Sequence, residues 1–114
     1  MPVAKTLAGP NASKESFDAL VDSMSRLHKE SYIKTIEAST MARNHGEPGD
    51  IRVPTHVIVG AEDRLTTPEM CRELAEMIQD ARFTVIPDAG HLVNIEQPAQ
   101  FNAAAIGFIR SARP

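Results

Sequence analysis

Apolar residues recur with a helical period in the first part of the chain. Between residues 13 and 27 they follow the i, i+3, i+4, i+7 spacing that places side chains on one face of a helix: Phe17, Leu20, Val21, Met24 and Leu27. Asn11 and Ser13 precede this stretch and are candidates for its N-cap. A second helix is predicted over Lys29–Arg43, with three apolar residues, Tyr32, Ile33 and Ile36. The pattern therefore predicts a helical segment that extends to about residue 50.

The pattern changes at residues 45–50, where the sequence HGEPGD brings two glycines and a proline together and marks a loop or a module boundary. Residues 56–59 (HVIV) are a short run rich in β-branched side chains, which predicts a buried strand. Residues 83–86 (FTVI) predict a second strand of the same kind. The chain is therefore predicted to divide near residue 50, with helices before that point and strands after it.

A helix is predicted after each of these strands. Thr67 and Pro68 are typical of a helix start, because threonine caps the N-terminus and proline is accepted at the first helical position. Pro98 marks the start of the last helix. The predicted apolar faces are Cys71, Leu74, Ala75 and Ile78 in the first helix and Phe101, Ala104, Ala105, Phe108 and Ile109 in the second. The order strand, helix, strand, helix indicates the α/β class, with two parallel strands joined by a right-handed crossover.

A sheet of two parallel strands has a physical difficulty. Parallel sheets normally bury both faces, and two strands alone do not make a stable sheet. At least one edge strand would expose unpaired backbone groups and apolar side chains. We therefore expect further strands from a missing part of the polypeptide, from a separate chain or from a second copy of this one.

Composition and charge exclude several classes of function. The 114 residues are enough for one domain, and 12 basic against 15 acidic residues leave no positive excess with which to bind nucleic acid. No apolar run is long enough to span a membrane, and the first ten residues lack the apolar core of a signal peptide. A single cysteine, Cys71, excludes an internal disulfide, and the four histidines lack the clustered spacing of a metal site. A cytoplasmic protein is expected.

Candidate chemistry lies in two loops, each of which follows a predicted strand. Gly60–Arg64 (GAEDR) follows the first strand and Pro87–His91 (PDAGH) follows the second. Functional groups of parallel α/β sheets gather beyond the carboxyl ends of the strands, so Asp63 and His91 are predicted to meet there. The carboxylate would accept the imidazole Nδ1–H, which fixes the tautomer and stabilises an imidazolium. Gly90 is predicted to permit an unusual backbone angle beside the ring.

Two segments carry a resemblance to a known family. IRVPTHVIVGAEDRLTTPE and ARFTVIPDAGHLVNIEQPAQFNAAAIGFI together resemble the C-terminal portion of the α/β-hydrolase fold, over roughly residues 51–110. The resemblance implies that Asp63 is the acid of a catalytic triad and His91 its base. HLVNIEQP is similar to the histidine loop of the enol-lactonase branch. Residues 1–50 would then be a helical, cap-like segment with two helices, and residues 51–114 the C-terminal β-α-β-α portion of the core.

One departure from the family pattern affects function directly. The family's nucleophile lies in a Gly-x-Ser-x-Gly elbow before the acid, and neither this motif nor an HGGG-type oxyanion segment occurs in the chain. The expected protein is therefore part of a hydrolase that acts on a small-molecule ester, lactone or related carbonyl, without a cofactor. Its nucleophile would come from another chain or have been lost by truncation. A nucleophilic aspartate in place of serine, with dehalogenase or epoxide-hydrolase chemistry, stays open.

The alternative hypothesis is a non-catalytic binding or self-associating module that retains the hydrolase tail, completed by a second copy of the chain. In either case the chain alone is predicted to be inactive. Three further residues have structural interpretations. His56 is expected to be packed in the sheet or exposed at its edge, Cys71 to be a small core residue, and Glu96 to belong to a helix start.

Overall fold

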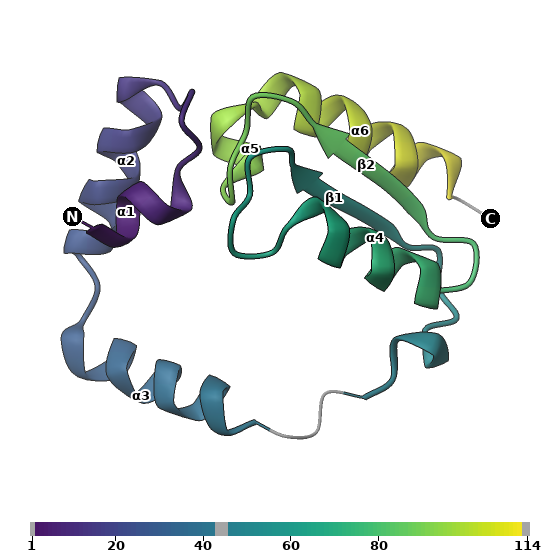
Figure 1. Ribbon diagram of the computed structural model, residues 1–114, viewed down its shortest axis with the longest axis horizontal. Coiled ribbons are helices and arrows are strands. Elements are labelled where there is room, and N and C mark those ends of the chain that lie inside the picture. Colours follow the sequence, from purple (N-terminus) through teal and green to yellow (C-terminus); the bar gives the residue numbers. More distant parts are fainter. Residues whose placement is uncertain (1, 43–45, 113–114) are drawn as a thin grey trace.

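The computed structural model describes residues 2–42 and 46–112 (Figure 1). The elements in chain order are α1 (Pro2–Leu7), α2 (Lys14–Ser25), α3 (Lys29–Met41), the 3-10 helix η1 (Pro48–Asp50), β1 (His56–Gly60), α4 (Pro68–Met77), β2 (Arg82–Ile86), α5 (Val93–Glu96) and α6 (Pro98–Ser111).

The predicted parallel pair of strands is confirmed. β1 and β2 pair in parallel, from His56 opposite Arg82 to Gly60 opposite Ile86, and α4 connects them. Within the described residues this sheet has two strands. The carboxyl ends of both strands therefore lie at one edge, from which the loops of the candidate site begin.

α4 and α6 cover opposite faces of the sheet (Figure 1). The guanidinium carbon of Arg72, on α4, lies 5.0 Å from the centre of the Phe83 ring. The guanidinium carbon of Arg82 lies 5.5 Å from the ring of Phe108, on α6. Because successive strand residues point to opposite faces, these two contacts place one helix on each side.

The predicted helix starts are confirmed by their caps. The Ser13 side chain accepts a hydrogen bond from the Ser16 amide at the start of α2. The Thr67 side chain accepts one from the Met70 amide at the start of α4. Each bond satisfies an amide that has no partner within the helix, which is the physical basis of the serine and threonine preference.

Other boundaries differ from the prediction. α3 ends at Met41, two residues before the predicted end, and both Arg43 and His45 lie outside the described residues. The segment before residue 42 holds three helices rather than two, because the six-residue α1 is too short to show a helical period. The four-residue α5 was missed for the same reason.

Three residues assigned to apolar helix faces are exposed, which corrects the prediction. Leu27, Leu74 and Ile109 lie at the surface, and Ile78 is buried but caps the end of α4 instead of continuing it. For Leu74 and Ile109 the physical reason is the narrow sheet, because two strands cannot cover the full width of α4 or α6, whereas Leu27 lies beyond the end of α2, which stops at Ser25. The periodicity correctly marks an apolar face, but the described residues do not provide enough surface to cover it.

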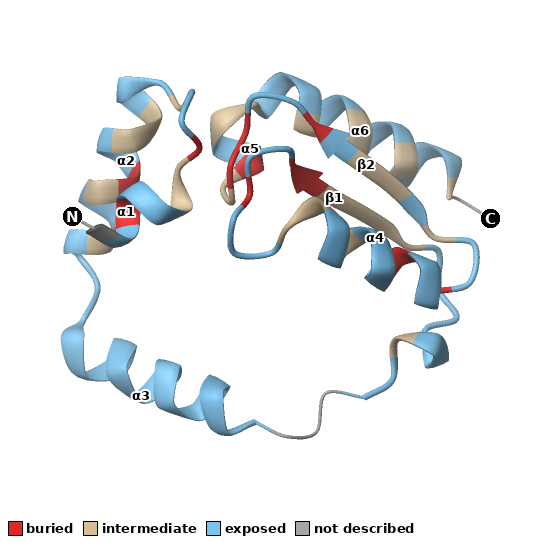
Figure 2. Cartoon of the chain, in the orientation of Figure 1, coloured by how far each residue is buried: buried red, intermediate tan, exposed pale blue. Residues whose placement is uncertain are grey.

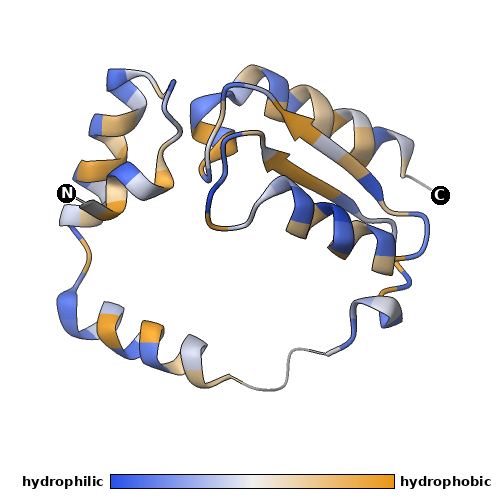
Figure 3. Cartoon of the chain, in the orientation of Figure 1, coloured by the Kyte–Doolittle hydropathy of each residue, from blue (hydrophilic) through white to orange (hydrophobic). Residues whose placement is uncertain are grey.

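The core is small and lies at the carboxyl end of the sheet (Figure 2). Ile86, Ala89 and Val93 form its buried cluster, and Ile58 and Phe101 pack against it. α3 has no buried residue, and its Tyr32, Ile33 and Ile36 are exposed. Figure 2 shows this helix in the exposed colour, and Figure 3 shows hydrophobic stretches along it. Among the described residues no helix combines the length and apolar character needed to cross a bilayer.

His56 is packed between β1 and α6, in agreement with its structural interpretation. Its Nε2 lies 2.8 Å from the Thr84 hydroxyl, and its ring centre lies 5.1 Å from that of Phe108. The buried Nδ1 has no hydrogen-bond partner among the described residues. Burial, and secondarily the positive charge of Arg82, lower the pKa of His56 from 6.5.

This lowered pKa predicts a loss of stability on acidification. Below pH 6.5 the unfolded chain protonates His56, whereas His56 in the folded chain stays neutral to lower pH. The unfolded state therefore binds more protons, and the free energy of unfolding decreases as the pH decreases. We expect the decline to begin near pH 6.5 and to be largely removed in His56→Leu, as measured by urea unfolding between pH 8 and pH 5. His28→Asn, which keeps a capping side chain at an exposed histidine, should retain it. An unchanged decline in His56→Leu would contradict the assignment.

Candidate active site

Two loops at the carboxyl end of the sheet are joined by backbone hydrogen bonds. The Ala61 amide donates to the Ile86 carbonyl at 2.9 Å, and the Glu62 amide donates to the Ala89 carbonyl at 2.8 Å. A Cβ atom on Gly60 would lie 2.3 Å from the carbonyl oxygen of Gly90, so the two main chains leave no space for a side chain at this position. The loop of Asp63 is thereby held directly against the loop of His91.

The prediction for Gly90 was wrong in its reason. Gly90 does not adopt a left-handed backbone angle; in its loop that conformation belongs to Asp88, with φ 55°. Gly90 is instead required by a close approach, because a Cβ atom there would lie 2.4 Å from the Gly9 nitrogen. Glycine can be required either for a left-handed backbone angle or for a close approach of two main chains, and the sequence alone does not show which of the two applies.

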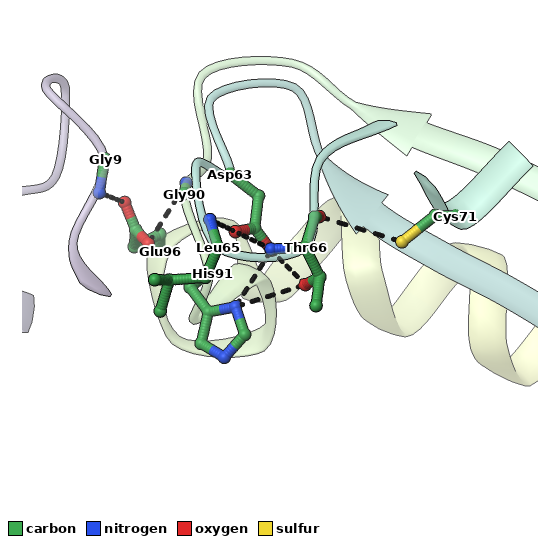
Figure 4. Close-up of polar contacts among 8 residues, drawn as sticks. All are labelled: Gly9, Asp63, Leu65, Thr66, Cys71, Gly90, His91 and Glu96. Atoms are coloured by element: carbon green, nitrogen blue, oxygen red, sulfur yellow. Dashed lines mark hydrogen bonds and ion pairs between the residues drawn. The ribbon is translucent and has the colours of Figure 1, made fainter. Parts of the chain in front are cut away.

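Asp63 is buried, with a side chain 4% exposed, and its carboxylate accepts four hydrogen bonds (Figure 4). Oδ1 accepts from the amides of Leu65 at 2.9 Å and Thr66 at 3.1 Å. Oδ2 accepts from the Thr66 hydroxyl at 2.9 Å and lies 2.9 Å from His91 Nδ1. The turn that follows Asp63 therefore fixes the carboxylate in one orientation.

The electrostatic balance at Asp63 favours the charged form. Burial acts to raise the pKa of the carboxyl, but the hydrogen bonds from His91, Leu65 and Thr66 together outweigh it and lower the pKa from 3.8. Asp63 is therefore an anion at neutral pH. A buried anion beside an imidazole holds the Nδ1 proton and stabilises a positive charge on the ring.

His91 sits at the surface of this site. Its side chain is 34% exposed, and Nδ1 faces Asp63 while the opposite edge of the ring, with Nε2, points away (Figure 4). Its backbone amide donates to the Leu7 carbonyl at 2.9 Å, which ties it to the N-terminal segment. With the proton held on Nδ1, Nε2 is the basic nitrogen and faces outward.

Sequence reasoning missed two residues of this site. Thr66 binds the Asp63 carboxylate through both its amide and its hydroxyl, and its hydroxyl lies 3.4 Å from His91 Nδ1. The Asp-x-x-Thr spacing is an available signal, since aspartate often accepts bonds from amides two and three residues on. Glu96 binds two glycine amides, and no local pattern reveals that role.

Cys71 shares a neighbour with the site but is not arranged as a nucleophile. Its sulfur lies 3.7 Å from the Thr66 carbonyl oxygen. Burial, and then the negative charge of Asp63, raise the pKa of the thiol from 9.0, so it is protonated at neutral pH. Among the described residues no group of three or more histidine, cysteine, aspartate or glutamate side chains is arranged to hold a metal ion.

Comparison with known proteins identifies the family. A model of the "Alpha/beta hydrolase family" matches residues 2–104. The chain belongs to the alpha/beta hydrolase family. The predicted resemblance is confirmed, and so is the fold class, an α/β-hydrolase fold present in part.

Alpha/beta hydrolases of known activity are among its relatives. The chain is 32% identical over 101 residues to 3-oxoadipate enol-lactonase 1 of Acinetobacter baylyi, covering 89% of this chain and 36% of that protein. An esterase structure from Thermogutta terrifontis superimposes with a TM-score of 0.56 at 36% identity, over 58% of this chain and 24% of that one.

The fold extends over the helical segment as well. A serine hydrolase involved in carbazole degradation, CarC, superimposes with a TM-score of 0.80 over 96% of this chain and 45% of its own. At 23% identity this likeness speaks for the fold alone. The chain spans about a quarter to a third of the length of the curated alpha/beta hydrolases it matches.

Proposed function

We propose that Asp63 and His91 are the acid and the base of a hydrolytic triad that acts on an ester, a lactone or a related carbonyl of a small molecule. The observation that carries this proposal is the 2.9 Å contact between a buried carboxylate and Nδ1 of a partly exposed imidazole. The contact joins the two loops at which alpha/beta sheets place functional groups. Membership in a hydrolase family supports the same reaction class.

Each residue would have one task in the reaction. A serine hydroxyl would attack the carbonyl while His91 Nε2 takes its proton, and the imidazolium would then give this proton to the departing alcohol oxygen, which leaves an acyl-serine. Nε2 would next take a proton from the water that attacks the acyl-serine and return it to the serine oxygen as the acid is released. Asp63 would hold the ring in the Nδ1–H tautomer and stabilise the imidazolium, without being protonated itself. No metal or organic cofactor enters these steps.

The nucleophile in this proposal comes from polypeptide outside the 114 residues, either more of the same chain or a second chain. The sequence contains no Gly-x-Ser-x-Gly elbow. The described sheet also has free edges and exposed apolar side chains nearby, including Val85, Ile106 and Ile109. Additional strands with the nucleophile elbow would cover these groups. Residues 1–50 would then form part of a cap over the site.

A chimera tests the triad directly. Residues 51–110 would replace the matching segment of the Thermogutta terrifontis esterase, and p-nitrophenyl butyrate hydrolysis would be measured. We expect a folded chimera to hydrolyse the ester and His91→Ala in it to be inactive, whereas Asp88→Asn, at an exposed position of the same grafted loop, should keep the activity. A folded chimera without activity would refute the proposal. Turnover by the 114-residue chain alone, abolished by His91→Ala, would refute an external nucleophile.

The exposed apolar surface favours a second candidate, a non-catalytic module that associates with itself. Large exposed apolar side chains occur on α3, α4 and α6, among them Ile36, Leu74 and Ile109. Native mass spectrometry of the chain from its natural source separates the two ideas. A complex with a different polypeptide supports the hydrolase, and a homo-oligomer of 12.4 kDa units supports the module.

A further inference from the structure

We propose that Glu96 is a positioning residue for His91. Its carboxylate bridges two main-chain segments that are far apart in sequence, and it thereby fixes the loop that ends in His91. The inference rests on the proposed function only in treating His91 as the base; the bridge itself can be tested without any reaction.

The bridge uses both carboxylate oxygens of Glu96, the last residue of α5 (Figure 4). Oε1 accepts from the Gly9 amide at 2.8 Å, across 87 residues of sequence, and Oε2 accepts from the Gly90 amide at 3.1 Å. Both bonds are partly buried. A carboxylate that accepts from two amides makes charge-assisted bonds, which are stronger than bonds between neutral groups.

The two glycines explain why a carboxylate is needed at this point. The main chains of Gly9 and Gly90 approach so closely that a Cβ on either would meet the other's backbone nitrogen at 2.7 or 2.4 Å. At this contact both amides point to Glu96 and not to each other's carbonyls. Without an acceptor, two partly buried N–H groups would lose their partners, which costs free energy and favours separation of the segments.

His91 follows this contact directly. Its amide donates to the Leu7 carbonyl at 2.9 Å, so the segment of residues 7–9 and the segment of residues 90–91 are joined by this bond and by the Glu96 bridge. Both Glu96 oxygens face main-chain amides, so Glu96 acts on the imidazole through the loop. The 2.9 Å contact with Asp63 requires the ring at one position, and a displacement of the loop would weaken it.

Nitrogen NMR on the full 114-residue chain tests the proposal with Glu96→Ala and Glu96→Gln. In Glu96→Ala we expect amide hydrogen exchange at Gly9 and Gly90 to accelerate about tenfold, which corresponds to the loss of one net hydrogen bond each. The His91 ring, now released from Asp63, should lose its dominant Nδ1–H tautomer. Glu96→Gln keeps one acceptor oxygen and should expose mainly one of the two amides, with a smaller tautomer change. Glu62→Gln, an exposed glutamate on the neighbouring loop, should alter neither signal.

The outcomes are separable. Faster amide hydrogen exchange at both glycines with an unchanged His91 tautomer would overturn the positioning role, because Glu96 would then only stabilise the contact between the two main-chain segments. Unchanged exchange would overturn the bridge itself. If Glu96→Ala does not fold, the isosteric Glu96→Gln decides by the same two signals. A tautomer shift combined with an inactive chimera would support this inference while refuting the proposed function.

Discussion

Gly60→Ala is expected to lower the free energy of unfolding by about 3 kcal/mol, at the upper end of the usual cost of overpacking. The new Cβ would lie 2.3 Å from the Gly90 carbonyl oxygen and 2.4 Å from that of Ala89. Both obstacles are main-chain atoms, so no side-chain rotation relieves the clash. The loops must separate, and with them the hydrogen bond from the Glu62 amide to the Ala89 carbonyl. A domain of this size has little stability to lose.

Gly107→Ala is the matched control for this substitution. Gly107 lies inside α6, and a Cβ there would meet nothing within 4 Å. Alanine is favoured over glycine in a helix interior by about 1 kcal/mol, so this variant should be more stable than the original chain. Urea unfolding followed by circular dichroism measures both. Equal stability of Gly60→Ala and the original chain would show that the two loops do not approach as closely as described.

Sequence patterns predicted the features that depend on residues close together in the chain. The strand positions and the caps at Ser13 and Thr67 depend on neighbouring residues and were confirmed, although the strands are buried only at their carboxyl ends. The parallel order followed from the connecting helix and was also confirmed. The meeting of two loops beyond the strands followed from topology, because adjacent parallel strands end at one edge. For these features the sequence was sufficient.

The rest depends on contacts across long stretches of sequence. The approach of Gly9 to Gly90 joins the segment after α1 to the histidine loop, and nothing near either glycine indicates it. Glu96 was interpreted from its position before Pro98, where a helix start is typical, yet its carboxylate serves two remote amides. Residue type and local spacing do not identify a partner 87 residues away.

The exposed apolar faces of α3 and α6 also depend on contacts that sequence patterns do not reveal. Periodicity predicts that a helix has an apolar side, but it does not say what covers that side. Ile36 and Ile109 are apolar and exposed because the described residues offer no surface opposite them. The same observation supports the proposal that polypeptide outside these 114 residues completes the sheet and brings the nucleophile.

Asp63→Asn is expected to reduce the activity of the chimera about 10,000-fold, the loss known when a triad carboxylate becomes an amide of the same shape. The Asn carbonyl can still accept from Leu65 and Thr66, so the turn should persist. The amide nitrogen would then face His91 Nδ1 and donate to it, which forces the proton onto Nε2. A ring protonated at Nε2 cannot accept a proton from a nucleophile there. The measurement is kcat/KM for p-nitrophenyl butyrate, with the His91 tautomer followed by nitrogen NMR in the 114-residue chain.

Asp88→Asn provides the control for charge. Asp88 is exposed, lies in the loop that carries His91, and has a positive φ that asparagine also tolerates. The Asp88→Asn substitution removes one negative charge three residues from His91 and should leave the activity and the His91 tautomer unchanged.

The two variants should also differ in their stability in acid. Because the pKa of Asp63 is lowered, its contribution to the free energy of unfolding is present above pH 3.8 and is lost as the pH falls through the folded value. Asp63→Asn should therefore remove this loss of stability, and Asp88→Asn should not. If Asp63→Asn keeps both activity and the Nδ1–H tautomer, the carboxylate does not orient the base, and the triad assignment fails at its acid.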